Sequence, residues 1–135
     1  MTRSYTTVDD NDILIWSLIG RVNADDVHRL YADQVAFCRG KPEIFVIVDL
    51  RQMQQMEAAA RQVAARGPDV DGKTMPVAGL AIIGGSFHMR LLAKMINKAA
   101  ALLTRAKTTP IEFFDTFDQA RQWITTRRNA TISTQ

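Results

Sequence analysis

Three long apolar segments constrain the fold of this chain more than any other feature. They read ILIWSLIG at residues 13–20, EIFVIVDL at 43–50 and PVAGLAIIG at 76–84. Each combines β-branched residues with a nearly unbroken apolar run, without the polar alternation of a half-solvated strand. Such strands are typical of a parallel sheet that is buried on both faces. The sequence therefore predicts a central, largely parallel β-sheet.

The segments between these strands predict helices that cover the sheet. Asn23 is a favourable N-cap for a helix that Gly40 ends. Residues 54–66 are rich in strong helix formers and predict a second helix. The longest helix should follow Gly84-Gly85-Ser86. Its apolar face would point toward the core and carry Leu91, Leu92, Met95, Ile96, Ala99, Leu102 and Leu103.

The two ends of the chain complete a mixed α/β architecture. Tyr5–Val8 should pair with the first apolar strand as an N-terminal hairpin, and Ile111–Phe114 should form a short last strand. Thr116 and Gln119 form a capping box for a fourth helix. We expect a single domain over residues 1–128, with a largely parallel sheet and about four helices. Residues 129–135 should form a polar C-terminal tail.

Composition excludes several classes of protein. The 135 residues are 47% hydrophobic and 23% charged, as in an ordinary globular domain, and no apolar run approaches a membrane span. The N-terminus lacks an apolar secretory segment, and the single cysteine, Cys38, suits a reducing compartment. We therefore expect a cytoplasmic protein. His28 and His88 lack the spacing of a helical metal pair, so neither a metal site nor a cofactor is predicted.

The order of these elements resembles the STAS fold of anti-sigma-factor antagonists. The apolar strand ending in Asp49-Leu50, and the closing Phe-Phe-Asp-x-Phe-x-x-Ala-x-x-Trp-Ile of residues 113–124, are similar to SpoIIAA-like proteins. The resemblance implies a bacterial, non-catalytic regulatory module that docks a protein partner or forms a homodimer. Classical members carry a phosphorylatable serine in an Asp-Ser-x-Gly turn, at the start of the helix after the Asp-Leu strand. Laid on this chain, that pattern places Glu57 at the acidic position and Ala58 at the serine.

Candidate site residues lie where parallel strands should end, because open α/β sheets bind ligands there. Gly84-Gly85-Ser86 is the sharpest of these turns and suggests an anion site at a helix N-terminus. Alternatively, the two glycines only make a tight strand-to-helix turn, and Ser86 caps the helix. We do not expect Ser86 and His88 to form a catalytic pair. The full candidate surface for a ligand or partner comprises Asp49, Arg51, Glu57, Ala58, Gly84, Gly85, Ser86, Asp115 and Thr116.

A basic face on the long helix supplies a second candidate, formed by Arg90, Lys94, Lys98 and Arg105. It is either a solvated face or a dock for an acidic protein or an anionic lipid headgroup. Nucleic acid is not expected, since no aromatic residues interleave with these cations to stack bases. Two functions remain open: a regulatory protein-docking module that lacks the usual serine, or a binder of lipid or a small apolar ligand. The ligand would sit beneath the long helix, gated by residues 69–75.

Overall fold

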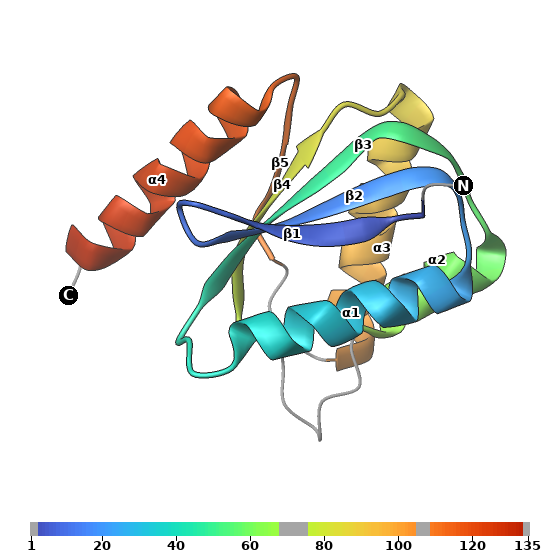
Figure 1. The fold of residues 1–135 in the computed structure, drawn as a ribbon, viewed down its shortest axis with the longest axis horizontal. Coiled ribbons are helices and arrows are strands. Elements are labelled where there is room, and N and C mark those ends of the chain that lie inside the picture. The colour runs from blue at the N-terminus through green and yellow to red at the C-terminus, as the bar shows by residue number, and fades with distance from the viewer. Residues whose placement is uncertain (1–2, 68–75, 105–108, 134–135) are drawn as a thin grey trace.

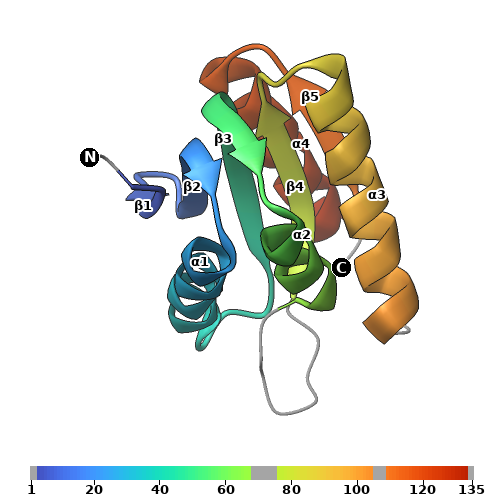
Figure 2. The ribbon, with the colours of Figure 1, turned by 90° about the vertical axis from the view of Figure 1, so that its right-hand side faces the viewer.

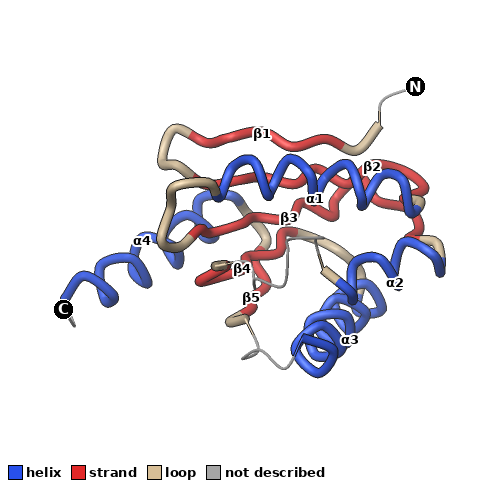
Figure 3. The backbone as a smooth tube through the Cα atoms, turned by 90° about the horizontal axis from the view of Figure 1, so that it is seen from below, coloured by secondary structure: helices blue, strands red, loops and turns tan. Residues whose placement is uncertain are grey.

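The computed structural model describes residues 3–67, 76–104 and 109–133 of the chain (Figure 1). It contains one sheet with five strands in chain order, which Figure 3 shows side by side. These strands are β1 (Tyr5–Asp9), β2 (Ile13–Val22), β3 (Ile44–Met56), β4 (Val77–Ile83) and β5 (Ile111–Phe114). β1 and β2 pair antiparallel, and the remaining neighbours pair parallel. The predicted mixed α/β sheet with its opening hairpin is thus confirmed.

Within the described residues, four helices cover the two faces of this sheet (Figure 2). They are α1 (Ala24–Cys38), α2 (Ala58–Arg66), α3 (Phe87–Thr104) and α4 (Phe117–Ser133). Side chains of α1, α2 and α3 pack in one hydrophobic cluster, whereas those of α4 pack in a second cluster on the opposite face. Alternate residues of the central strands enter the two clusters, so Val46 faces α1 and Ile47 faces α4. Burial on both faces explains the continuous apolar runs.

The cap of α1 forms as the sequence predicts. The side chain of Asn23 accepts a hydrogen bond from the backbone N–H of Asp26, and Asp26 accepts one from the backbone N–H of Asn23. Gln34 is the polar residue that interrupts the apolar face of this helix, and it is buried. Local capping chemistry therefore fixes the start of α1.

The predicted helix over residues 54–66 is wrong in its first turn. Strand β3 continues to Met56, and α2 begins only at Ala58. The cause lies in the neighbouring strand, because β2 also runs on to Val22, which pairs with Met56. Met53 is buried in the core, and the N–H of Glu57 donates to the carbonyl of Val22 at 2.9 Å. Pairing with β2 outweighs the helix propensity of this segment.

Helix α4 continues to Ser133, past the start of the polar tail that we expected. Just before this part, Arg128 contacts other elements of the domain, whereas Arg127 contacts Trp123 one turn earlier in the same helix. The guanidinium group of Arg127 lies 5.2 Å from the ring centroid of Trp123, and that of Arg128 lies 5.1 Å from that of Phe45. Arg128 also donates to the carbonyl oxygens of Asn11 at 2.6 Å and Asp12 at 2.8 Å. The contacts of Arg128 hold α4 against the domain directly before residues 129–133, whose composition alone indicates a tail.

Candidate functional site

Asp49 and Arg51 form a neutralised pair on β3. Asp49 is buried and accepts hydrogen bonds from the backbone N–H, Nε and Nη2 of Arg51 at 3.0, 2.9 and 2.9 Å. Burial acts to raise the pKa of Asp49, but the hydrogen bonds and charge of Arg51 outweigh it and hold this pKa below its ordinary value of 3.8. The carboxylate is therefore engaged inside the protein, and its fork-like pairing suits a structural role.

Gly84 and Gly85 carry the chain from β4 into α3 close to this pair. Both adopt positive φ angles, +74° and +86°. A Cβ atom on Gly84 would lie 2.6 Å from Cγ of Arg51, and one on Gly85 would lie 3.1 Å from Cδ1 of Leu50. The turn thus needs glycine both for its backbone conformation and for its close approach to β3.

The polar residues that follow β4 and β5 cap helices. The hydroxyl of Ser86 accepts the backbone N–H of Met89 at 3.2 Å, and the hydroxyl of Thr116 accepts that of Gln119 at 3.2 Å. The side chain of Gln119 accepts the N–H of Asp115 at 3.1 Å. The caps by Ser86 and Thr116 are confirmed, but the side chain of Gln119 accepts the N–H of Asp115 rather than that of Thr116, so the predicted capping box forms only in part. Among the described residues, Ser86 has no hydrogen bond with His88, so the geometry of a nucleophile and its base is missing there.

The structure gathers most of the predicted strand-end residues but separates two of them. Asp49 contacts Arg51, Arg51 borders Gly84, and the N–H of Gly84 donates to the carbonyl of Phe114, just before Asp115. Glu57 and Ala58 lie apart, because β3 runs on to Met56 beyond its last β4 pairing, Asp49 with Ile83. Ala58 is the exposed first residue of α2, and Glu57 lies 3.7 Å from Arg21.

Helix α3 exposes large apolar side chains that we expected to face the core. Phe87, Leu91 and Met95 follow one another at intervals of four residues and are 76%, 46% and 59% exposed. The predicted core positions of Leu91 and Met95 are therefore wrong. The helix instead packs inward through Met89 and Ala93. Large apolar residues lie on both the inward and the outward side of this helix, so their spacing did not show which of them face the core.

The cations predicted on α3 divide between two environments. Lys94 and Lys98 are exposed, and the helical spacing places them beside Leu91 and Met95 on the outward face. Arg90 instead turns toward the strand ends, where it donates to the carbonyl of Gly84 at 3.2 Å and lies 3.6 Å from Asp115. Arg105 lies outside the described residues, as does the predicted gating loop. We call Phe87, Leu91, Lys94, Met95 and Lys98 the α3 face.

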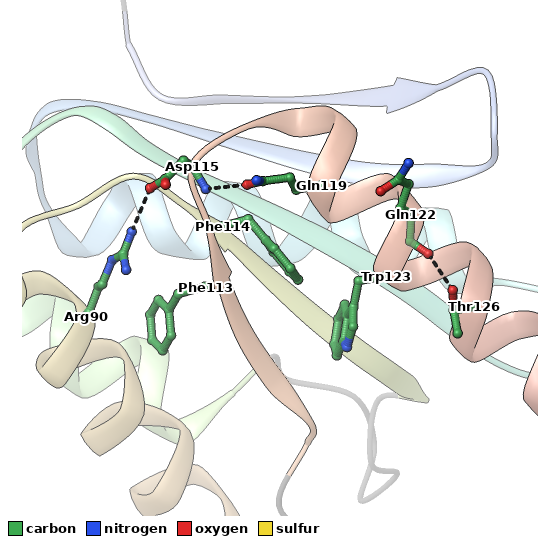
Figure 4. Close-up of a pocket in the computed structure, with 8 residues that line it drawn as sticks. All are labelled: Arg90, Phe113, Phe114, Asp115, Gln119, Gln122, Trp123 and Thr126. Carbon is green, nitrogen blue, oxygen red and sulfur yellow. Dashed lines mark hydrogen bonds and ion pairs between the residues drawn. The ribbon is translucent and has the colours of Figure 1, made fainter.

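A cleft of about 560 Å³ opens at the edge of the sheet beside β5 (Figure 4). Arg90 of α3 lines one side, and α4 lines the other. Phe113 points toward α3, whereas Phe114 points toward Trp123 of α4, with ring centroids 5.8 Å apart. The sequence analysis placed Phe113 and Phe114 on the last strand and Trp123 in the motif of residues 113–124, and it missed the cleft. The complete lining is Arg90, Phe113, Phe114, Asp115, Gln119, Gln122, Trp123 and Thr126.

In the described part of the chain, no group of three His, Cys, Asp or Glu side chains is placed to hold a metal ion. None of the helices within the described ranges has both the length and the apolar character required to cross a bilayer.

Comparisons with known proteins agree with this architecture. The family model described as SpoIIAA-like matches residues 13–125. None of the curated proteins compared with the chain matches it. Two solved structures share the fold. One is an uncharacterised Shewanella loihica PV-4 protein of the DUF3478 family, with a SpoIIAA-like fold. It has a TM-score of 0.57 and 17% identity, over 89% of this chain and 90% of that one.

The second solved structure is the anti-sigma factor antagonist SpoIIAA in its unphosphorylated form. Its TM-score is 0.57 at 11% identity, over 90% of this chain and 97% of that one. At these identities both likenesses concern the fold. The family model spans the chain from β2 into α4, which includes every strand of the parallel sheet. The chain belongs to the SpoIIAA-like family.

Proposed function

We propose that this protein is a non-catalytic regulatory module that docks reversibly on an anionic membrane surface through the α3 face. One observation carries the proposal: Phe87, Leu91 and Met95 are exposed in a row, and Lys94 and Lys98 lie among them. An interfacial helix has this composition, because apolar side chains enter the acyl boundary while lysines meet the headgroups. In α3, apolar and basic side chains share the side of the helix that faces away from the sheet.

The strength of such docking follows from the burial of apolar side chains and from the attraction of lysines to anionic lipids. Full burial of each large apolar side chain contributes roughly 1.5–3 kcal/mol, and partial insertion contributes less. Each lysine near an anionic leaflet adds about 1 kcal/mol. Three apolar residues and two lysines therefore support weak, reversible attachment, which suits a regulatory module better than a permanent anchor.

The polar residues at the strand ends support the non-catalytic part of the proposal. Asp49 is neutralised by Arg51, while Ser86 and Thr116 cap helices. Each of these groups already has an internal partner, which leaves a substrate little reactive chemistry to use.

Protein docking is the second candidate, and the fold likeness to an anti-sigma factor antagonist favours it. Ala58 begins α2 and exposes no hydroxyl, so a phosphorylation switch at that position would be absent. The α3 face would then meet an acidic partner surface, or a second copy of the chain. Both alternatives predict that vesicles do not bind.

The first prediction concerns the apolar row. The triple variant Phe87→Ser, Leu91→Ser, Met95→Ser should lose vesicle binding by at least about tenfold, since it removes every large apolar side chain of the α3 face. Flotation with vesicles of phosphatidylglycerol and phosphatidylcholine measures this. The matched control, Tyr5→Ser with Val8→Ser, removes exposed apolar groups from β1 and should bind as wild type does. Wild-type protein that fails to float, or a triple variant that floats normally, contradicts membrane docking.

The second prediction concerns charge. Lys94→Glu with Lys98→Glu should weaken binding to anionic vesicles by about tenfold or more at low salt, because two attractions become repulsions. The control, Arg61→Glu with Arg66→Glu, makes the same change in net charge on exposed positions of α2. It should weaken binding much less. Equal losses in the two variants would show that net charge, and not the α3 face, governs attachment.

A further inference from the structure

Among the described residues, no strand pairs with the outer edge of β5, and Phe113 and Phe114 of this strand line the cleft. Strand β5 ends the sheet. The carbonyl of Pro110, just before β5, accepts the N–H of Leu80 in β4, and the carbonyl of Phe114 accepts the N–H of Gly84, just after β4. Because backbone groups alternate in direction along a strand, those of Ile111 and Phe113 point away from β4. Their N–H and C=O groups form a short template for another strand.

The two walls of the cleft differ in chemistry. On the α3 side, the charged groups of Arg90 and Lys94 each lie 5.4 Å from the ring centroid of Phe113. This wall is aromatic and carries two cations, of which Arg90 also lies 3.6 Å from the exposed Asp115. On the α4 side, Phe114 and Trp123 form an apolar surface, bordered by the amides of Gln119 and Gln122.

We propose that the cleft beside β5 binds an extended peptide segment of a partner protein, which adds to the sheet as a sixth strand. Side chains of an added strand alternate between the two faces of the sheet. Every second residue would meet Arg90 and Lys94, and the residues between would meet Phe114 and Trp123. Charge complementarity therefore specifies a segment in which acidic and apolar residues alternate. Main-chain hydrogen bonds to Ile111 and Phe113 would hold it in register.

A second copy of this chain fits the cleft less well. In antiparallel pairing of β5 with itself, residues on the α3 side stay on that side, so Ile111 or Phe113 of the copy would meet Arg90 and Lys94. The acidic residue that follows on this side, Asp115, already lies 3.6 Å from Arg90 of its own copy, and the two α3 helices would approach each other. The expected occupant is therefore a foreign segment, and self-association is an outcome that the test must distinguish.

The experiment uses the synthetic peptide acetyl-Glu-Val-Glu-Phe-Glu-Val-Glu-amide with the full chain. We expect saturable binding, with slowed amide hydrogen exchange at Ile111 and Phe113 in nuclear magnetic resonance spectra. Two N-methylated peptides test the geometry, one methylated at every Glu and the other at each apolar residue. Only one set of amides can face β5 in a strand. One methylated peptide should therefore bind at least about tenfold more weakly, while the other binds as the parent does.

Variants of the protein provide a second, independent readout. Lys94→Glu should weaken peptide binding about fivefold, whereas Lys98→Glu, one turn along on the same helix, should change it less than about twofold. Both variants should weaken vesicle docking. Because Lys98→Glu should leave peptide binding almost unchanged, the result for the peptide site can be distinguished from the result for the α3 face. The proposal is overturned if no peptide binding saturates up to millimolar concentration. It is also overturned if both methylated peptides behave alike, or if free protein already forms dimers that protect Ile111 and Phe113.

Discussion

Gly84→Ala is expected to destabilise the protein by about 2–4 kcal/mol. Its φ angle of +74° costs an L-residue about 1–2 kcal/mol, and the new Cβ would lie 2.6 Å from Cγ of Arg51. Arg51 can give way only by disturbing its hydrogen bonds with the buried Asp49. Urea unfolding monitored by circular dichroism measures the loss.

Gly40→Ala is the matched control for this prediction. Gly40 has a similar φ angle of +76°, but a Cβ there meets nothing within 4 Å. Its substitution should lower the free energy of unfolding only by the cost of a positive φ angle in an alanine residue. In an Arg51→Ala background, which lacks Cγ, the cost of Gly84→Ala should fall to that of Gly40→Ala. An equal cost of Gly84→Ala with and without Arg51 would show that contact with β3 is not what requires glycine.

This turn illustrates which features of the fold can be predicted from sequence. Features that depend on neighbouring residues in the sequence can be predicted. The apolar runs predict buried strands, Asn23 predicts the start of α1, and Ser86 and Thr116 predict two helix caps. The paired glycines predict a sharp turn between β4 and α3. That Gly84 lies against Arg51 depends on the register of β3 and β4, which is a tertiary property.

The predictions are wrong where contacts with a segment far away in the sequence determine the local structure. Strand β3 extends to Met56 because β2 offers it a partner as far as Val22. Leu91 and Met95 face outward because α3 rests on the domain through other apolar positions, which its sequence does not distinguish. The cleft is missed because it needs α3, β5 and α4 together, and because its aromatics have the composition of a core.

The two proposed surfaces share helix α3 but use different sides of it. The α3 face points away from the sheet, whereas Arg90 points to Asp115 at the cleft. Lys94 lies on the α3 face and also 5.4 Å from the ring centroid of Phe113, so it borders both surfaces. A peptide bound at β5 and a membrane bound at the α3 face would then both interact with Lys94. This arrangement gives a regulatory module a direct physical link between its two targets.

Asp26→Ala is expected to destabilise the protein by about 2–3 kcal/mol at pH 7. The carboxylate of Asp26 is buried and accepts hydrogen bonds from the N–H of Asn23 at 3.0 Å, from Arg3 at 3.1 Å and from Arg29 at 3.0 Å. Removing one partner of a fully buried ion pair costs about 3–5 kcal/mol, and the cost is lower here because both arginines reach solvent. Asp25→Ala in the same turn should cost about 0.3–1 kcal/mol, from the helix dipole alone.

The stabilisation from Asp26 should also depend on pH. Burial acts to raise the pKa of Asp26, but its hydrogen bonds with Asn23, Arg29 and Arg3 outweigh burial and lower this pKa below the ordinary 3.8. In the unfolded chain the group binds protons more readily, so its contribution is complete above pH 3.8 and is lost as pH falls through the lower, folded pKa. Thermal unfolding of wild type and Asp26→Asn should therefore differ most near neutral pH, and the difference should shrink below about pH 4. Asp9 and Asp49 also have lowered pKa values, so the variant should keep part of the acid sensitivity. A difference that stays constant from pH 7 to pH 2 would show that the charge of Asp26 does not stabilise the fold.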